Sequence, residues 1–110
     1  MARPNFPGMG GNMQQIMKQA QKMQQDVARI QQEISERKFT ASVGGGVVSA
    51  TVYGRKELKT IVIDPSCVDP NDVEMLQDLV IGAVNEALRM AEETMNAEMN
   101  RATGGMNLGF

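Results

Sequence analysis

The sequence contains no histidine and no tryptophan, and only one of its 110 residues is a cysteine. Without histidine, the chain lacks the usual general base at neutral pH and the commonest metal ligand. One cysteine cannot form a disulfide within the chain, and a reducing cytoplasm is the expected compartment. We therefore expect no metal, no cofactor and no small-molecule substrate, and a protein that is not an enzyme.

Aromatic residues and long apolar segments are also scarce. Aromatic side chains make up 4% of the sequence, so a core must be built from Val, Ile, Leu and Met. A small domain of this kind often gains buried area by forming a homodimer. No segment approaches the roughly 18 apolar residues of a membrane span, and no signal-peptide pattern opens the chain, so we expect no membrane partner.

The two ends of the chain are rich in glycine and proline and show no hydrophobic period. Residues 1–11 are predicted to form a flexible N-terminal tail, and residues 103–110 a flexible C-terminal tail. Residues 12–102 would then form one domain.

A long helix is predicted after the N-terminal tail. Apolar residues from Met13 to Ile34 recur at spacings of three and four, which places them along one side of a helix. Asn12 is the predicted N-cap, with Gln15 completing a capping box, and the helix would end near Arg37.

A second long helix is predicted near the C-terminus. The same apolar repeat runs from Val73 to Thr94. Asp69 is the predicted N-cap, Pro70 would occupy the first helical position, and the helix would end near Ala102.

Three strands are predicted between the helices. Residues 39–43, 47–53 and 58–63 are rich in β-branched residues. The segments 44–46 and 54–56 are predicted turns, and such short turns join antiparallel strands. The predicted fold class is α+β: an αβββα subunit with a three-stranded antiparallel sheet flanked by two long helices. Its exposed sheet edges and helix seams favour a dimer.

No arrangement of residues predicts catalysis or ligand binding. Cys67 has no base to activate it, and the glycines at 44–46 lack the spacing of a phosphate-binding loop. The carboxylates of the second helix are typical of a solvated face. We interpret the helix methionines mainly as core or dimer packing, with an adaptable binding groove as the alternative. They are Met13, Met17, Met23, Met75, Met90, Met95 and Met99.

Charge is distributed unevenly along the chain. Residues 1–60 carry a net charge of +5 and residues 61–110 carry −7. Because Lys and Arg side chains bind phosphates by releasing counterions, the basic half is the candidate surface for double-stranded DNA. The candidate DNA-binding residues are Lys18, Lys22 and Arg29 on the first helix, Arg37 and Lys38 at its end, and Arg55, Lys56 and Lys59 near the second turn.

A second hypothesis stays open, because two long helices could also hold a polypeptide. The chain would then be a protein-interaction or chaperone-like adaptor. The pI of about 5.1 is low for a nucleic-acid-binding domain. No helix-turn-helix, zinc-finger or RNP pattern is present, so any DNA binding is predicted to have weak sequence preference.

Six short segments stand in a fixed order along the chain. They are Met17–Gln24, Gly44–Val48, Thr51-Val52, Val62–Ser66, Glu74–Val80 and Asn85–Ala87. In their order and spacing, from about residue 12 to residue 102, the sequence resembles the YbaB/EbfC family of bacterial nucleoid-associated proteins. It departs from the family pattern at Tyr53 and Cys67, where Asn and Leu are common.

The resemblance implies an αβββα subunit and a homodimer, formed through the sheet, whose long helices project like tweezers. It also implies DNA binding that alters DNA conformation, with roles in nucleoid organisation and the regulation of gene expression. It brings no invariant DNA-contact residue, so the candidate contacts rest on charge alone.

Overall fold

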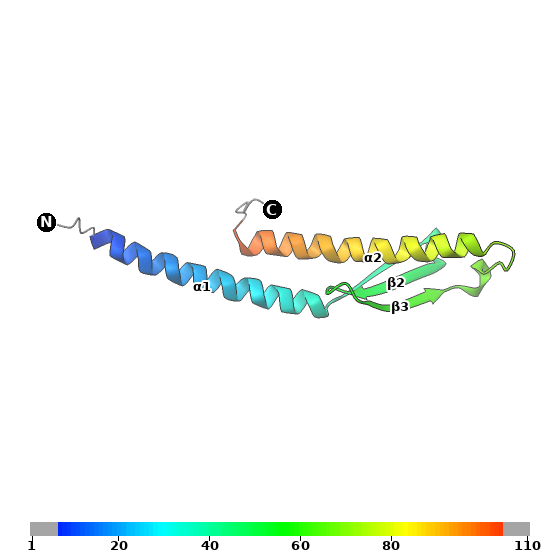
Figure 1. Cartoon of the computed structure of the whole chain (residues 1–110), viewed down its shortest axis with the longest axis horizontal. Coiled ribbons are helices and arrows are strands. Elements are labelled where there is room, and N and C mark those ends of the chain that lie inside the picture. The colour runs from blue at the N-terminus through cyan, green and yellow to red at the C-terminus, as the bar shows by residue number, and fades with distance from the viewer. Residues whose placement is uncertain (1–6, 105–110) are drawn as a thin grey trace.

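The computed structural model describes residues 7–104, with side chains from residue 13 onward. Its main elements are α1 (Pro7–Glu36), β1 (Lys38–Val43), β2 (Val48–Tyr53), β3 (Leu58–Ile63) and α2 (Val73–Ala102), as Figure 1 shows. Short 3₁₀ turns follow β1 and β3. The α+β class and the order of helix, three strands and helix are as predicted.

The three strands form one antiparallel sheet in the order β1-β2-β3. Lys38 of β1 lies opposite Tyr53 of β2, and Val48 of β2 lies opposite Ile63 of β3. An irregularity in the β2–β3 pairing follows Thr51, and Lys59 lies beside it. The predicted turn at 44–46 is confirmed, and its three glycines all have positive φ values of 62° to 98°, which other residues rarely adopt.

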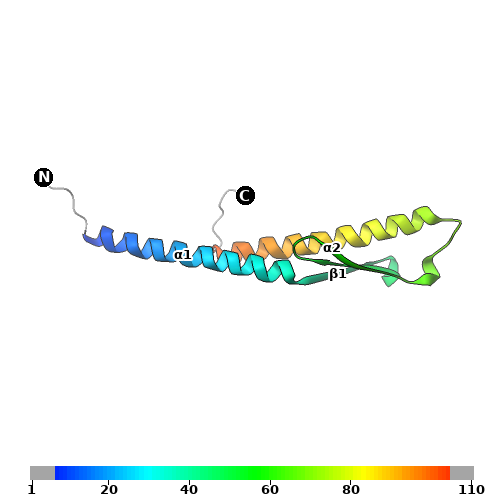
Figure 2. The same cartoon turned by 60° about the horizontal axis from the view of Figure 1, so that its bottom comes forward.

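Helix α2 covers one face of the sheet, as Figures 1 and 2 show. Alternate residues of β1 and β2 point toward it, so that Phe39 and Val52 are buried. The helix presents a row of fully buried alanines to the sheet, at positions 83, 87 and 91. Their small side chains allow a close approach. The opposite sheet face is polar, and the hydroxyls of Thr40 and Thr51 hydrogen-bond across it at 2.8 Å.

Helix α1 packs against the rest of the molecule only near its C-terminal end. Ile34 belongs to the core, and Ile30 packs against it. Residues 13–25 are exposed, apart from a half-buried Met23. Figure 1 shows this part of α1 projecting beyond the C-terminal end of α2. We call residues 13–25 the arm.

The first helix begins earlier than predicted. It starts at Pro7, so the predicted N-cap at Asn12 is wrong, and residues 7–11 are helical rather than part of a tail. Proline is tolerated at the first helical position because its missing N–H has no partner there in any helix. Residues 1–6 and 105–110 of the predicted tails lie outside the described residues.

The second helix begins later than predicted. Its N-cap is Asp72, whose carboxylate accepts a hydrogen bond from the Met75 N–H at 3.1 Å, and not Asp69. Asp69 accepts from the Asn71 N–H at 2.9 Å and stabilises a turn that contains Pro70. The predicted end at residue 102 is correct. No helix in the described residues is long and apolar enough to cross a membrane.

Candidate nucleic-acid interface

The arm contains two lysines and no carboxylate, and Asp26 follows one helical turn after Lys22. Lys18 and Lys22 are exposed and one helical turn apart, so they lie on the same side of α1. No Asp or Glu occurs from Met13 to Gln25. The arm therefore carries a charge of about +2 that no carboxylate within it offsets.

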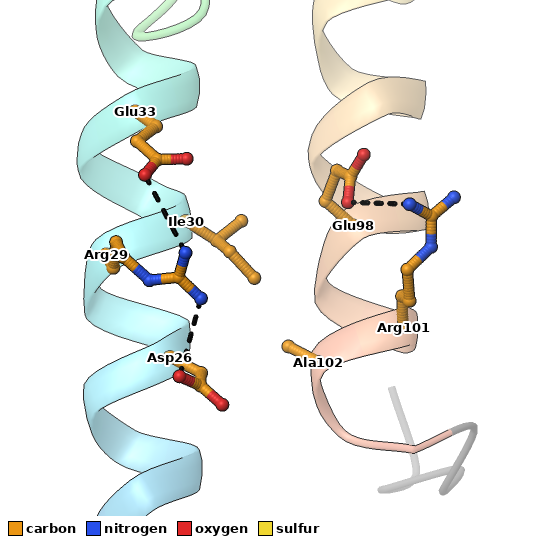
Figure 3. Close-up of a pocket in the computed structure, with 7 residues that line it drawn as sticks. All are labelled: Asp26, Arg29, Ile30, Glu33, Glu98, Arg101 and Ala102. Atoms are coloured by element: carbon orange, nitrogen blue, oxygen red, sulfur yellow. Dashed lines mark hydrogen bonds and ion pairs between the residues drawn. The ribbon is translucent and has the colours of Figure 1, made fainter.

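Arg29 differs from the arm lysines because two carboxylates flank it. Its guanidinium lies 3.4 Å from Asp26 and 3.8 Å from Glu33, along the same side of α1 (Figure 3). Facing them on α2, Arg101 pairs with Glu98 at 3.5 Å. These exposed pairs are weak. The carboxylates would nevertheless stay beside any phosphate that Arg29 bound.

Figure 3 also shows where the two helices part. A cavity of about 310 Å³ lies between them, with Ile30 and Ala102 among its lining residues. The end of α2, at Ala102, lies level with Asp26. Beyond this point α1 continues as the arm without a neighbouring helix.

Four other basic candidates come together at the junction of α1 and β1. The turn between β2 and β3 folds back onto this junction, and the Gly54 N–H donates to the Arg37 carbonyl at 2.8 Å. Arg37 and Lys38 are thereby brought beside Arg55 and Lys56. We call these four residues the junction cluster. Glu36 and Glu57 also lie in this region, and their negative charges offset part of the positive charge of the four basic residues.

The junction cluster and the arm form two separate basic regions. Lys22 precedes Arg37 by 15 residues, which corresponds to about 22 Å along a helix. Lys59 is exposed on β3, three residues after Lys56, and extends the junction cluster rather than the arm. The candidates predicted from the sequence therefore divide between these two regions, and Arg29 lies between them on α1.

Helix α2 is acidic, with a net charge of −4 over residues 73–102. Arg89 pairs with Glu86 at 2.6 Å and also with Glu93. The hydrogen bond from Arg89 lowers the pKa of Glu86 below its ordinary value. This helix would repel DNA, so the arm and the junction cluster are the better candidate surfaces.

A second exposed surface is apolar and was not predicted in detail. Ile61 and Ile63 of β3 lie on the sheet face that α2 covers, but they remain 36% and 37% exposed because α2 packs over β1 and β2. On α2, Ile81 is 56% exposed and lines a shallow hollow with Leu76 and Val80. The sequence indicates this surface by the uninterrupted apolar run at 61–63, because a strand with one face in solvent usually alternates apolar and polar residues.

The methionines divide between the two interpretations given to them. Met90 and Met95 pack against the core of the described fold. Met13 and Met17 are 56% and 58% exposed on the arm. Cys67 is half-buried against the cluster that contains Val48, its backbone N–H donates to the Asp64 carbonyl at 3.0 Å, and its thiol is free.

Residues 9–106 match the model of the YbaB/EbfC DNA-binding family. The chain belongs to this family, as its sequence motifs predicted. Membership in a DNA-binding family also agrees with the prediction that the chain is not an enzyme.

Two relatives match along nearly their whole length. A nucleoid-associated protein of Clostridium acetobutylicum is 57% identical over 109 residues, covering 98% of this chain and 97% of the relative. A nucleoid-associated protein of Acetivibrio thermocellus is 55% identical over 106 residues, covering 96% and 94%. The crystal structure of an uncharacterised Helicobacter pylori protein is similar with a TM-score of 0.57 and 27% identity, covering 68% of this chain and 87% of that one.

Proposed function

We propose that this chain is a nucleoid-associated protein that binds double-stranded DNA as a homodimer and alters DNA conformation. The observation that carries the proposal is the arm, a projecting helix with two lysines and no carboxylate. Phosphate contacts from Lys18 and Lys22 would be doubled by two-fold symmetry. Family membership and the names of close relatives support the same function.

The junction cluster would provide a second set of phosphate contacts. Arg37, Lys38 and Lys56 are exposed there, with Lys59 nearby. Contacts at two basic regions on each protomer would hold one duplex at several points, which favours bending or wrapping. Such a protein would act in nucleoid organisation and influence gene expression with weak sequence preference.

The apolar surface supports the homodimer. Ile61, Ile63 and Ile81 would be covered by a second copy, because burying exposed apolar side chains at an interface is favourable. Since β3 is an edge strand, its backbone groups are also open to pairing across the interface. This arrangement leaves the arm of each protomer free.

The dimer is tested by sedimentation equilibrium of Ile61→Lys. The substitution places a charge in the proposed interface, and we expect dissociation into monomers. Thr60→Lys is the matched control, because Thr60 is also exposed on β3 but lies on the opposite face of the sheet. If Ile61→Lys remains as dimeric as the unsubstituted protein, the interface lies elsewhere.

DNA contact is tested by the salt dependence of binding to a fluorescently labelled duplex. The slope of log K against log salt is negative, and it becomes shallower by about 0.9 for each phosphate contact that is lost. We expect Lys18→Gln and Lys22→Gln to flatten the slope. Arg29→Gln removes the same charge from α1, but from a residue already flanked by Asp26 and Glu33, so its slope should change less. Equal slopes for all variants would exclude the arm as a contact surface.

A protein-interaction role is the second candidate function, supported by the exposed apolar side chains of the arm. Ile16 and Met17 are each 58% exposed and lie beside the lysines. They could hold a partner helix instead of DNA. If Ile16→Ser with Met17→Ser leaves DNA affinity unchanged and a partner polypeptide is lost, this function is supported.

A further inference from the structure

The turn between β2 and β3 closes the C-terminal end of α1. The last carbonyl groups of a helix have no partner within it. Here the Ser35 carbonyl accepts hydrogen bonds from the Arg55 N–H at 3.3 Å and from Arg55 Nη1 at 3.2 Å. The Gly54 N–H binds the Arg37 carbonyl next to it. Residues far apart in sequence thus supply the C-terminal cap of the helix.

The Arg55 side chain is held in this position from several directions. Its Nε donates to Glu57 Oε2 at 3.1 Å, and its guanidinium stacks on the Tyr53 ring at 4.1 Å. The Glu57 contact raises the pKa of Arg55 above its ordinary value. A cation at the C-terminal end of a helix also interacts favourably with the helix dipole. The guanidinium is therefore already engaged by the protein itself.

The arm is joined to the core through this capped end of α1. Only the C-terminal part of α1 packs on the core, and the chain leaves the helix directly for β1. Met13 precedes Arg37 by 24 residues, or about 36 Å of helix. A rotation of about 10° at the junction would move Met13 by about 6 Å on this lever. Small changes at the cap become large displacements of the arm.

We propose that Arg55 is a positioning residue that fixes the direction of the arm, rather than a residue that contacts DNA phosphate. By capping α1 from the β2–β3 turn, it links the orientation of the arm to the sheet. Within the proposed DNA-binding function, it would set the separation of the two arms in a dimer. The capping role itself does not depend on DNA binding.

The first experiment measures the arm without DNA. Spin labels at Met13→Cys and Asn100→Cys, in a Cys67→Ser background, give a distance distribution by pulsed EPR. An excess of unlabelled protein restricts the measurement to pairs within one protomer. We expect Arg55→Ala and Arg55→Lys to broaden or shift the distribution by several ångströms, since a rotation of about 10° on the lever of about 36 Å moves Met13 by about 6 Å. Lys56→Ala is the matched control, because Lys56 is the neighbouring cation and makes no side-chain hydrogen bond or ion pair among the described residues.

An unchanged distribution in Arg55→Ala would overturn the proposal, and so would a full return to the original distribution in Arg55→Lys. Lysine keeps the charge but cannot bind Glu57, the Ser35 carbonyl and the Tyr53 ring in the geometry of a planar guanidinium. Circular dichroism melts confirm that each variant is folded.

The second experiment separates positioning from phosphate contact. A positioning role predicts that Arg55→Lys lowers DNA affinity while the salt slope stays the same. A phosphate contact predicts that Arg55→Lys binds like the unsubstituted protein and that Arg55→Ala flattens the slope by about 0.9 per contact. If no variant and no unsubstituted protein binds DNA, the proposed function fails, and the EPR result still decides the capping role.

Discussion

Replacing Gly54 with alanine is expected to destabilise the fold strongly, although the change adds one methyl group. A Cβ at this position would lie 1.8 Å from the Ile34 carbonyl oxygen and 2.6 Å from its carbon. Both are backbone atoms, so no side-chain rotation relieves the overlap. The β2–β3 turn must move away from α1 by more than an ångström.

The size of the effect follows from the contacts that this movement breaks. The hydrogen bonds from Gly54 to Arg37 and from Arg55 to Ser35 would be lost. At about 1 kcal/mol each, with further loss of packing around Ile34, the total is about 3 kcal/mol. For a domain of this size the melting temperature should fall by roughly 12–24 °C.

The measurement is thermal and urea unfolding at one fixed protein concentration, since the stability of a dimer depends on concentration. Gly82→Ala is the matched control. A Cβ at Gly82 lies 3.8 Å from Val43, an ordinary contact, and alanine should stabilise helix α2 by up to about 1 kcal/mol. The reasoning is refuted if Gly54→Ala unfolds within about 0.5 kcal/mol of the unsubstituted protein.

Three further predictions concern other parts of the molecule. Lys56 has a φ of +66°, which glycine adopts without strain. Lys56→Gly should therefore raise the free energy of unfolding by up to about 1 kcal/mol while weakening DNA binding. A lower free energy of unfolding would contradict this. Ala87→Leu should cost about 1–3 kcal/mol or more, because Ala87 is fully buried between α2 and the sheet; an unchanged melting temperature would show that α2 is free to move away. The pKa of Glu86 is lowered in the folded protein, so its carboxylate stabilises the fold fully at pH values above 4.5, its ordinary pKa. This stabilisation is lost as the pH falls through the lower pKa of the folded state. The melting temperature of Glu86→Gln should therefore depend less on pH as the pH falls below 4.5.

The sequence predicts the elements well because their patterns are local. The apolar repeat in both helices and the β-branched runs depend on neighbours a few residues apart. Helix starts were predicted less well, since two aspartates precede α2 and the structure uses Asp72, not Asp69, as the N-cap. No local signal distinguishes Asp69, which stabilises the preceding turn.

The candidate interface could be predicted only in part. Exposed basic residues are visible in the sequence, and their helix spacing places Lys18 and Lys22 together. The meeting of Arg55 with the end of α1 is a contact between residues 20 positions apart, and it depends on how the sheet is oriented. The structure adds that Arg29 pairs with both Asp26 and Glu33, whereas Lys18 and Lys22 form no ion pair among the described residues.

The projecting arm also explains how a chain with a net charge of −2 could bind a polyanion. The end of α2 lies level with Asp26, so Glu98 lies near the level of Ile30 and is about 18 Å from Lys18 along the helix axes. The screening length is about 8 Å at physiological salt and about 30 Å at 0.01 M. At physiological salt, DNA at the arm should therefore be screened from the negative charge of α2. At 0.01 M salt, α2 should repel it. We expect Glu98→Gln to raise DNA affinity at 0.01 M salt and to have no effect at 0.15 M, whereas Lys18→Gln should weaken binding at both. An equal gain for Glu98→Gln at both salt concentrations would mean that DNA lies against α2, and the arm would then not be the main contact surface.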